Sequence, residues 1–130
     1  MSNIKSNKIF KTACIASDHA GFKLKEDIKD YLIDNNFSVF DIGPHNDRSV
    51  DYPDYAKKLG NRIKLKKSNV GILICGSGTG MAISANKIKT IRAAVCYNLK
   101  STRLSRQHNN SNIIALGSRL TKKKIVSKIS

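Results

Sequence analysis

Cys75 is the residue whose position best suits acid–base or nucleophilic chemistry. It ends an almost wholly apolar run, Val70–Cys75, and immediately precedes the string Gly76-Ser-Gly-Thr-Gly80. Glycines let backbone N–H groups close on an anion, and such N–H dipoles favour a thiolate. Two plainer interpretations stay open, namely that the string is a tight strand-to-helix turn and that Cys75 is a small buried hydrophobic residue.

The glycine string does not match two common nucleotide-binding motifs. A Walker loop would continue with Gly-Lys-Ser or Gly-Lys-Thr, which is absent here. Met81 stands where the third glycine of the dinucleotide fingerprint belongs, and no acidic residue follows to hold a ribose. We therefore expect an anion cradle made of backbone N–H groups rather than a nucleotide-binding loop of either kind.

Two histidines are further candidates for proton transfer. Asp18-His19 follows the first apolar run and pairs an acceptor with a titratable imidazole. His108-Asn109 follows the fourth predicted helix. Either histidine alone would be read as a surface or capping residue, and it is their joint position near the loops of a basic domain that favours a functional role.

The charge of the chain is strongly asymmetric. Its 130 residues carry 24 Lys and Arg against 9 Asp and Glu, for a formal net charge of +15, and every carboxylate side chain lies between Asp18 and Asp54. A catalytic carboxylate must therefore come from the first half. Excess positive charge favours an anionic partner, either nucleic acid or a phosphorylated small molecule. The basic residues form no stripe interleaved with aromatic residues, which argues against nucleic acid and leaves compositional bias as an alternative.

The cysteines and the terminus indicate a cellular compartment. Cys14, Cys75 and Cys96 form no Cys-x-x-Cys pair, and their odd number argues against a disulfide framework. We expect Cys14 and Cys96, inside apolar runs, to be core residues. No apolar run approaches the ~18 residues of a membrane span, and Met1–Lys11 lacks the apolar segment of a secretory signal. We expect a cytoplasmic protein with no membrane partner.

Alternating strands and helices must position these side chains. Apolar runs alternate with amphipathic stretches, which is typical of strand–helix units. The pattern predicts strands over 12–17, 38–42, 70–75, 92–96 and 112–116. It predicts helices after Gly21, from Pro53, after Gly80, over 98–107 and from Thr121.

These elements predict one domain over residues 11–130, after a polar N-terminal extension over residues 1–10. The fold class is α/β, a Rossmann-like three-layer α/β/α sandwich with a five-stranded parallel sheet. Ligands of such folds bind outside the carboxyl ends of the strands. The segments expected there are 18–19, 43–52, 75–80, 97–98 and 117–119.

Several strings together resemble one enzyme family. They are Ser17-Asp-His-Ala-Gly21, Asp51-Tyr-Pro53, Ile74-Cys-Gly-Ser-Gly-Thr-Gly80, Ala85-Asn-Lys87, Ile91-Arg-Ala93, Ser105-Arg-Gln-His-Asn109 and Gly117-Ser-Arg119. Their order and spacing closely resemble those of the RpiB-type sugar-phosphate isomerases over about residues 10–120. A set of strings in this order is far more specific than any one of them.

The resemblance implies an aldose–ketose isomerase of the pentose phosphate pathway. Family members interconvert ribose 5-phosphate and ribulose 5-phosphate through a cis-enediolate, with no metal and no cofactor. By resemblance, Cys75 is the base that moves the proton between C2 and C1, and Ser77 shuttles the proton between O1 and O2. Some relatives use a glutamate at the position of Met81 instead. The enediolate would be held by the backbone N–H groups of Gly76, Gly78, Thr79 and Gly80.

The remaining site residues are also implied by the resemblance. Ring opening falls to Asp18 and His108. The substrate contacts are Tyr52, Asn86 and Asn109 for the hydroxyl groups, and His19 and Arg119 for the phosphate. The family places the pocket at a homodimer interface, with a tetramer as the alternative, and His108 and Arg119 come from the second subunit.

The C-terminus departs from the family pattern. Relatives continue with a longer helix and an arginine-bearing tail that clamps the phosphate, whereas this sequence ends at Ser130, as in a C-terminally shortened member. The lysines at 122–124 are poor replacements for bidentate guanidinium groups, so we expect weaker phosphate binding.

Two other functions stay open on the sequence. One is an isomerase of a six-carbon sugar phosphate, such as galactose 6-phosphate or allose 6-phosphate. The depth of the pocket decides between a five-carbon and a six-carbon substrate. The other is a non-enzymatic protein, either an inactive shortened relative or a basic binding module. An isomerase assay combined with the oligomeric mass distinguishes these functions. Retention on a nucleic-acid column that falls steeply with salt would favour the binding module.

Overall fold

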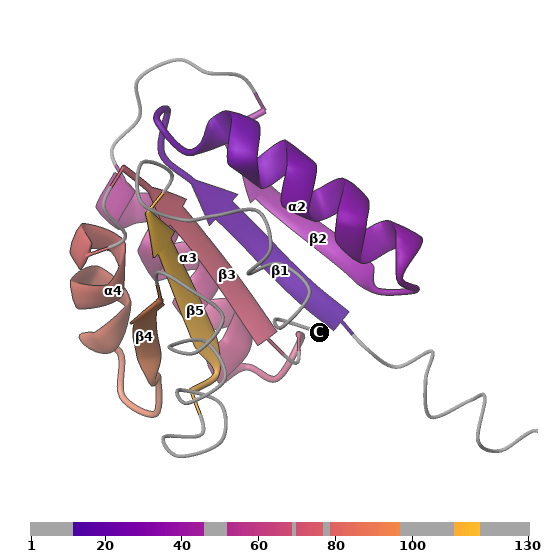
Figure 1. Ribbon diagram of the computed structural model, residues 1–130. Coiled ribbons are helices and arrows are strands. Elements are labelled where there is room, and N and C mark those ends of the chain that lie inside the picture. Colours follow the sequence, from indigo (N-terminus) through magenta and orange to yellow (C-terminus); the bar gives the residue numbers. More distant parts are fainter. Residues whose placement is uncertain (1–11, 46–51, 69, 77–78, 97–110, 118–130) are drawn as a thin grey trace, which may run out of the picture.

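The computed structural model describes residues 12–45, 52–68, 70–76, 79–96 and 111–117 (Figure 1). The elements in these ranges are β1 (Thr12–Ser17), α2 (Phe22–Asp34), β2 (Ser38–Gly43), α3 (Tyr52–Lys64), β3 (Val70–Cys75), α4 (Thr79–Asn86), β4 (Ala93–Cys96) and β5 (Ile113–Gly117). All five predicted strands are confirmed to within a residue at each end. The helices predicted over 98–107 and from Thr121 lie outside the described residues.

The strands form one parallel sheet in the order β2-β1-β3-β5-β4. The sequence predicted the parallel sheet but not this order. From β1 the chain passes through α2 to β2 on one side, whereas β3 leads through α4 to the strands on the other side. The change of direction occurs between β1 and β3, and a crevice for ligands opens outside the carboxyl ends of strands at such a point.

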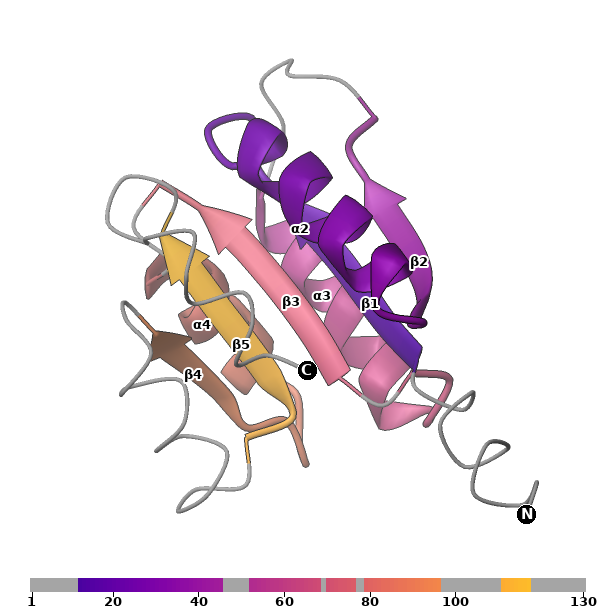
Figure 2. The same cartoon turned by 45° about the vertical axis from the view of Figure 1, so that its right-hand side comes forward.

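Helices cover both faces of the sheet, which confirms the predicted three-layer arrangement. Figures 1 and 2 show α2 on one face and α3 and α4 on the other. Under α2, Ile28 and Leu32 pack with Ile15 and Ile72 in one buried cluster. A second cluster lies under α3 and α4. Since β3 is buried along its whole length, its sequence is continuously apolar rather than alternating.

Gly21 allows α2 to begin close to the carboxyl end of β3. A Cβ atom at this position would lie 2.8 Å from the carbonyl oxygen of Ile74 and 2.6 Å from its Cγ2. Any larger residue would therefore push the helix start away from the sheet. The turn from β1 into α2 is thereby held against β3, immediately before Cys75.

An ionic cluster that the sequence analysis did not predict joins α2 to β2. Lys25 is fully buried, and its Nζ lies 2.7 Å from Asp41 Oδ2 and 2.8 Å from Glu26 Oε2. Lys29 Nζ lies 3.0 Å from the same oxygen of Asp41. Burial alone raises the pKa of Asp41, but hydrogen bonds from the two lysines outweigh it and hold the pKa below its usual value. These ion pairs thus hold the carboxyl end of β2 against α2.

Candidate active site

The fold brings Asp18 and Cys75 to the same edge of the sheet. Ser17 pairs with Ile74 in the β1–β3 register, and the backbone N–H of Asp18 donates to the carbonyl of Ile74 at 3.0 Å. Asp18 therefore follows β1, and Cys75 ends the neighbouring strand β3, where the strand order changes direction. A carboxylate and a thiol carried by neighbouring strand ends are suited to proton transfer on one small ligand.

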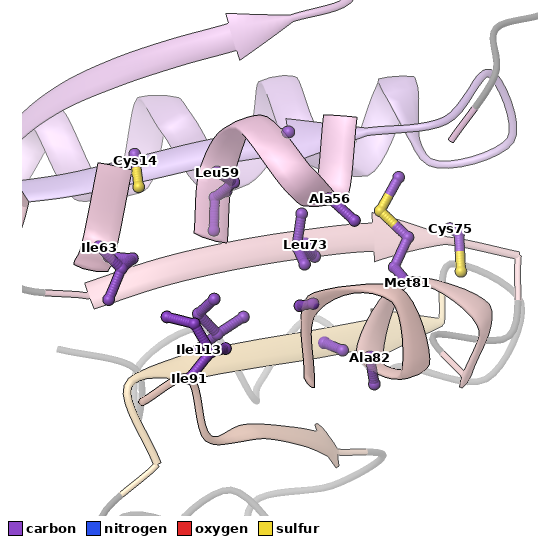
Figure 3. Close-up of a cluster of buried hydrophobic side chains, with 13 residues drawn as sticks. Cys14, Ala56, Leu59, Ile63, Leu73, Cys75, Met81, Ala82, Ile91 and Ile113 are labelled. Carbon is purple, nitrogen blue, oxygen red and sulfur yellow. The ribbon is translucent and has the colours of Figure 1, made fainter. Parts of the chain in front are cut away.

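Cys75 lies at the boundary between the core and this edge. Its side chain is 5% exposed and belongs to the buried cluster that contains Met81 and Ala82 of α4 (Figure 3). The helix begins four residues later, at Thr79. The first N–H groups of a helix have no partners within the helix, and the start of α4 therefore points backbone donors toward the end of β3. Gly76 is buried, while Ser77 and Gly78 lie outside the described residues.

The other two cysteines are core residues, as the sequence predicted. Cys14 and Cys96 are both fully buried. Burial raises the pKa of the Cys14 thiol to about 11, against smaller lowering effects of Ser68 and Arg62. Cys14 is therefore a neutral thiol at physiological pH, packed on the α3 side of the sheet.

Asp18 has one carboxylate oxygen engaged in local structure. Its Oδ1 accepts a hydrogen bond from the backbone N–H of Gly21 at 2.8 Å, which orients the carboxylate at the start of α2. The other oxygen has no hydrogen-bond partner among the residues that the structure describes. His19, the next residue, is exposed at the same turn. The turn thus presents an anchored carboxylate and an accessible imidazole.

Asn86 is not brought to this edge. It is the last residue of α4, and its side-chain amide donates to the carbonyl of Ala93 at 3.0 Å and accepts from the N–H of Ala93 at 2.8 Å. Ala93 is level with Ile113 and hence with Gly71, near the amino end of β3, whereas Cys75 ends that strand. The amide is engaged in joining α4 to β4, so the geometry does not support the expected substrate contact.

For four other expected site residues, the structure describes only the backbone or nothing. Tyr52 is the first residue of α3, and nothing is described for its side chain. His108, Asn109 and Arg119 fall outside the described residues. Gly117 pairs with Cys75 in the β3–β5 register, so the chain leaves β5 at the same edge of the sheet.

Ser17 is a polar residue at this edge that the sequence analysis did not single out. Its side chain is fully buried, and its Oγ has no hydrogen-bond partner within the described part of the chain. A buried hydroxyl without a partner costs about 1–3 kcal/mol. The signal in the sequence was a serine at the end of an apolar run.

The described residues show neither a metal-ligand cluster nor a membrane-spanning helix. They contain no group of three or more His, Cys, Asp and Glu side chains that could hold a metal ion. Among them, no helix has the length and apolar character that crossing a membrane requires. The expectation of metal-free chemistry remains a prediction for experiment.

Comparison with known proteins gives a consistent result. A family model described as Ribose/Galactose Isomerase matches residues 13–130. The chain is 42% identical over 110 residues to the ribose-5-phosphate isomerase B of Escherichia coli, a match that covers 85% of this chain and 74% of that protein.

Solved structures agree with the sequence match. The structure of Clostridium thermocellum ribose-5-phosphate isomerase B is similar with a TM-score of 0.87 and 44% identity, covering 91% of this chain and 80% of that one. The Mycoplasma genitalium ribose-5-phosphate isomerase B, solved with bound ribulose-5-phosphate, is similar with a TM-score of 0.82 and 39% identity, covering 88% and 78%. This chain therefore belongs to the ribose/galactose isomerase family.

Proposed function

We propose that the protein is an aldose–ketose isomerase that interconverts ribose 5-phosphate and ribulose 5-phosphate. The observation that carries the proposal is the placement of Asp18 and Cys75 at the carboxyl ends of neighbouring strands, where the strand order changes direction. The similar enzyme from Mycoplasma genitalium, which binds ribulose-5-phosphate, supports the choice of a pentose phosphate.

In the proposed reaction, the thiolate of Cys75 removes the proton from C2 of the open-chain aldose and returns it to C1. The electron pair of the broken C–H bond forms the enediolate, which the N–H groups of residues 76–80 stabilise. Hydrogen bonds that strengthen as negative charge develops lower the barrier rather than only tightening binding. Ser77 carries the accompanying proton between O1 and O2.

Asp18 and His108 open the furanose ring in this proposal. Asp18 suits this role because Gly21 anchors one carboxylate oxygen and the other faces no partner among the described residues. His19 and Arg119 hold the phosphate, and Tyr52 and Asn109 contact the sugar hydroxyl groups. Asn86 is left out of the substrate contacts, because its amide binds the backbone of Ala93.

The proposed working form is a homodimer in the cytoplasm, acting in the pentose phosphate pathway. His108 and Arg119 of one subunit would complete the site of the other. This part of the proposal rests on the resemblance to the family.

The direct test is an isomerase assay on purified protein with ribose 5-phosphate. Galactose 6-phosphate and allose 6-phosphate serve as comparison substrates, and the assay is repeated in excess chelator. We expect kcat/KM on ribose 5-phosphate to exceed the others by about tenfold or more, because an extra carbon must fit the same pocket. We also expect activity to persist in chelator. A preference for a six-carbon substrate, or loss of activity with chelator, would contradict the proposal.

A further inference from the structure

A groove of about 510 Å³ lies between β2 and the second half of α3, and it is lined by none of the proposed active-site residues. Two large apolar side chains face it, Phe40 of β2 and Leu65 just after α3. Their exposed fractions are 49% and 64%. Since exposed apolar side chains scattered singly are ordinary, it is their occurrence together in one groove that points to a ligand.

Cationic side chains line the same groove. Lys58 and Arg62 are one helical turn apart on α3, so they project from the same face, and Lys67 follows the helix. The acid that lines the groove is Asp41. Its carboxylate is paired with the buried Lys25 at 2.7 Å, and therefore does not offset the cations.

Arg62 is already held in place on the aromatic ring. The centre of its guanidinium lies 3.7 Å from the centroid of the Phe40 ring, and its Nε donates to Ser68 Oγ at 3.1 Å. The terminal guanidinium nitrogens have no hydrogen-bond partner within the described residues. A guanidinium fixed in this way loses little conformational entropy when it binds an anion in a bidentate manner.

We propose that this groove binds a nucleoside polyphosphate. The base packs against Phe40 and Leu65, and the phosphates pair with Lys58, Arg62 and Lys67. The volume suits a small molecule rather than a folded partner, since ligand pockets span about 300–1,000 Å³. An exposed aromatic ring beside several cations matches a ligand with a flat ring and several negative charges.

Other ligands fit these features less well. A sugar phosphate has no flat ring to cover Phe40 and Leu65. A second copy of this chain would bring a further net charge of +15 to a cationic surface.

The test is calorimetric titration of the full chain with ATP, tripolyphosphate and adenosine. The site variant K58E/K67E is compared with K57E/K64E, which makes the same change in net charge at exposed lysines of the same region that do not line the groove. We expect ATP binding to weaken by about tenfold or more in K58E/K67E, and by less than about twofold in K57E/K64E. L65S should weaken ATP binding and leave tripolyphosphate binding unchanged.

Isomerase activity and the melting temperature, measured on the same variants, verify that each one is folded. Equal losses of ATP affinity in the two double variants would mean that ATP binding depends only on net charge, and would overturn the proposal. The same holds if tripolyphosphate binds as tightly as ATP, or if ATP does not bind the unmodified protein. An oligomer that dissociates in K58E/K67E without any ATP binding would assign the groove to a second copy instead.

Discussion

At the scale of single residues, the three cysteines differ in what their surroundings permit. Cys14 and Cys96 are fully buried in the two clusters on opposite faces of the sheet. Burial raises the pKa of Cys14 to about 11. Cys75 ends its strand at the edge of the sheet where α4 begins. A thiol can act as a base only where its thiolate is stabilised and the substrate can reach it. Position along the strand therefore separates the candidate base from the structural cysteines.

Replacement of Cys75 by Ala is expected to abolish most of the isomerase activity. Loss of a general base typically lowers the rate by about 10²- to 10⁴-fold, and we expect this loss in kcat. The melting temperature should change little, because the small side chain lies at the margin of its cluster.

Cys14→Ala is the matched control, since it removes a thiol from the same buried cluster. It should lower the melting temperature and leave kcat near the wild-type value. Wild-type kcat in Cys75→Ala would show that another group is the base.

Asn86 provides a second residue-scale prediction, because its amide makes both hydrogen bonds with the backbone of Ala93. Asn86→Ala is expected to lower the free energy of unfolding by about 1–3 kcal/mol, since the N–H and carbonyl of Ala93 lose their partners. KM for ribose 5-phosphate should stay within about twofold, measured on the folded fraction. A large increase in KM with unchanged stability would restore Asn86 to the substrate site.

At the scale of elements, the contact between α2 and β2 depends on charge rather than on apolar packing alone. The pKa of Glu26 is lowered chiefly by its hydrogen bond to Lys25, and the pKa of Lys29 is raised chiefly by its hydrogen bond to Asp41. Asp41 also accepts the backbone N–H of Gly43 at 2.9 Å. The buried Lys25 requires these carboxylates, since an uncompensated buried charge is strongly unfavourable.

Asp41→Asn is expected to destabilise the protein by about 3 kcal/mol at neutral pH, because it removes the carboxylate that lies closest to the buried Lys25 Nζ. The pKa of Asp41 is lower in the folded state than in the unfolded chain, so the stability it contributes is present above the unfolded value. That contribution is lost as the pH falls through the lower, folded value.

Chemical denaturation across a pH series measures this effect. The difference in stability between wild type and Asp41→Asn should narrow as the pH falls below about 4. Asp30→Asn makes the same change in charge at an exposed position of α2 and should stay within about 0.5 kcal/mol of wild type. A difference that is independent of pH would mean that Asp41 acts through packing and not through its charge.

At the scale of the whole molecule, the proposed site requires two subunits. If Cys75 of one subunit works with His108 of the other, Cys75→Ala and His108→Ala proteins should each be inactive alone. Mixed dimers then contain one site with both changes and one site with neither.

Unfolding and refolding the two variants together should restore about a quarter of wild-type activity, because half of the random dimers are mixed and half of their sites are intact. Each variant refolded alone is the control. No recovery, in a sample whose mass shows mixed dimers, would show that each site is built within one subunit.

The sequence by itself determined the five strands and the three helices that the structure describes, and it indicated the enzyme family. Continuous apolar character marked β3 as a covered strand, and the glycine string after Cys75 marked the start of α4; both depend on local periodicity and turn chemistry, which neighbouring residues encode. The set of strings in order over about residues 10–120 indicated the family, which the family model over residues 13–130 confirms.

Tertiary structure alone decided which of these residues meet. The order of the strands brings β1 beside β3 and hence Asp18 beside Cys75, and it leaves Asn86 at the opposite edge. It also pairs the buried Lys25 with Asp41, although a lysine in the apolar stripe of a helix was a signal in the sequence. Strand order and ion pairs join residues far apart in the chain, and their energies depend on burial and distance, which no local pattern of residues contains.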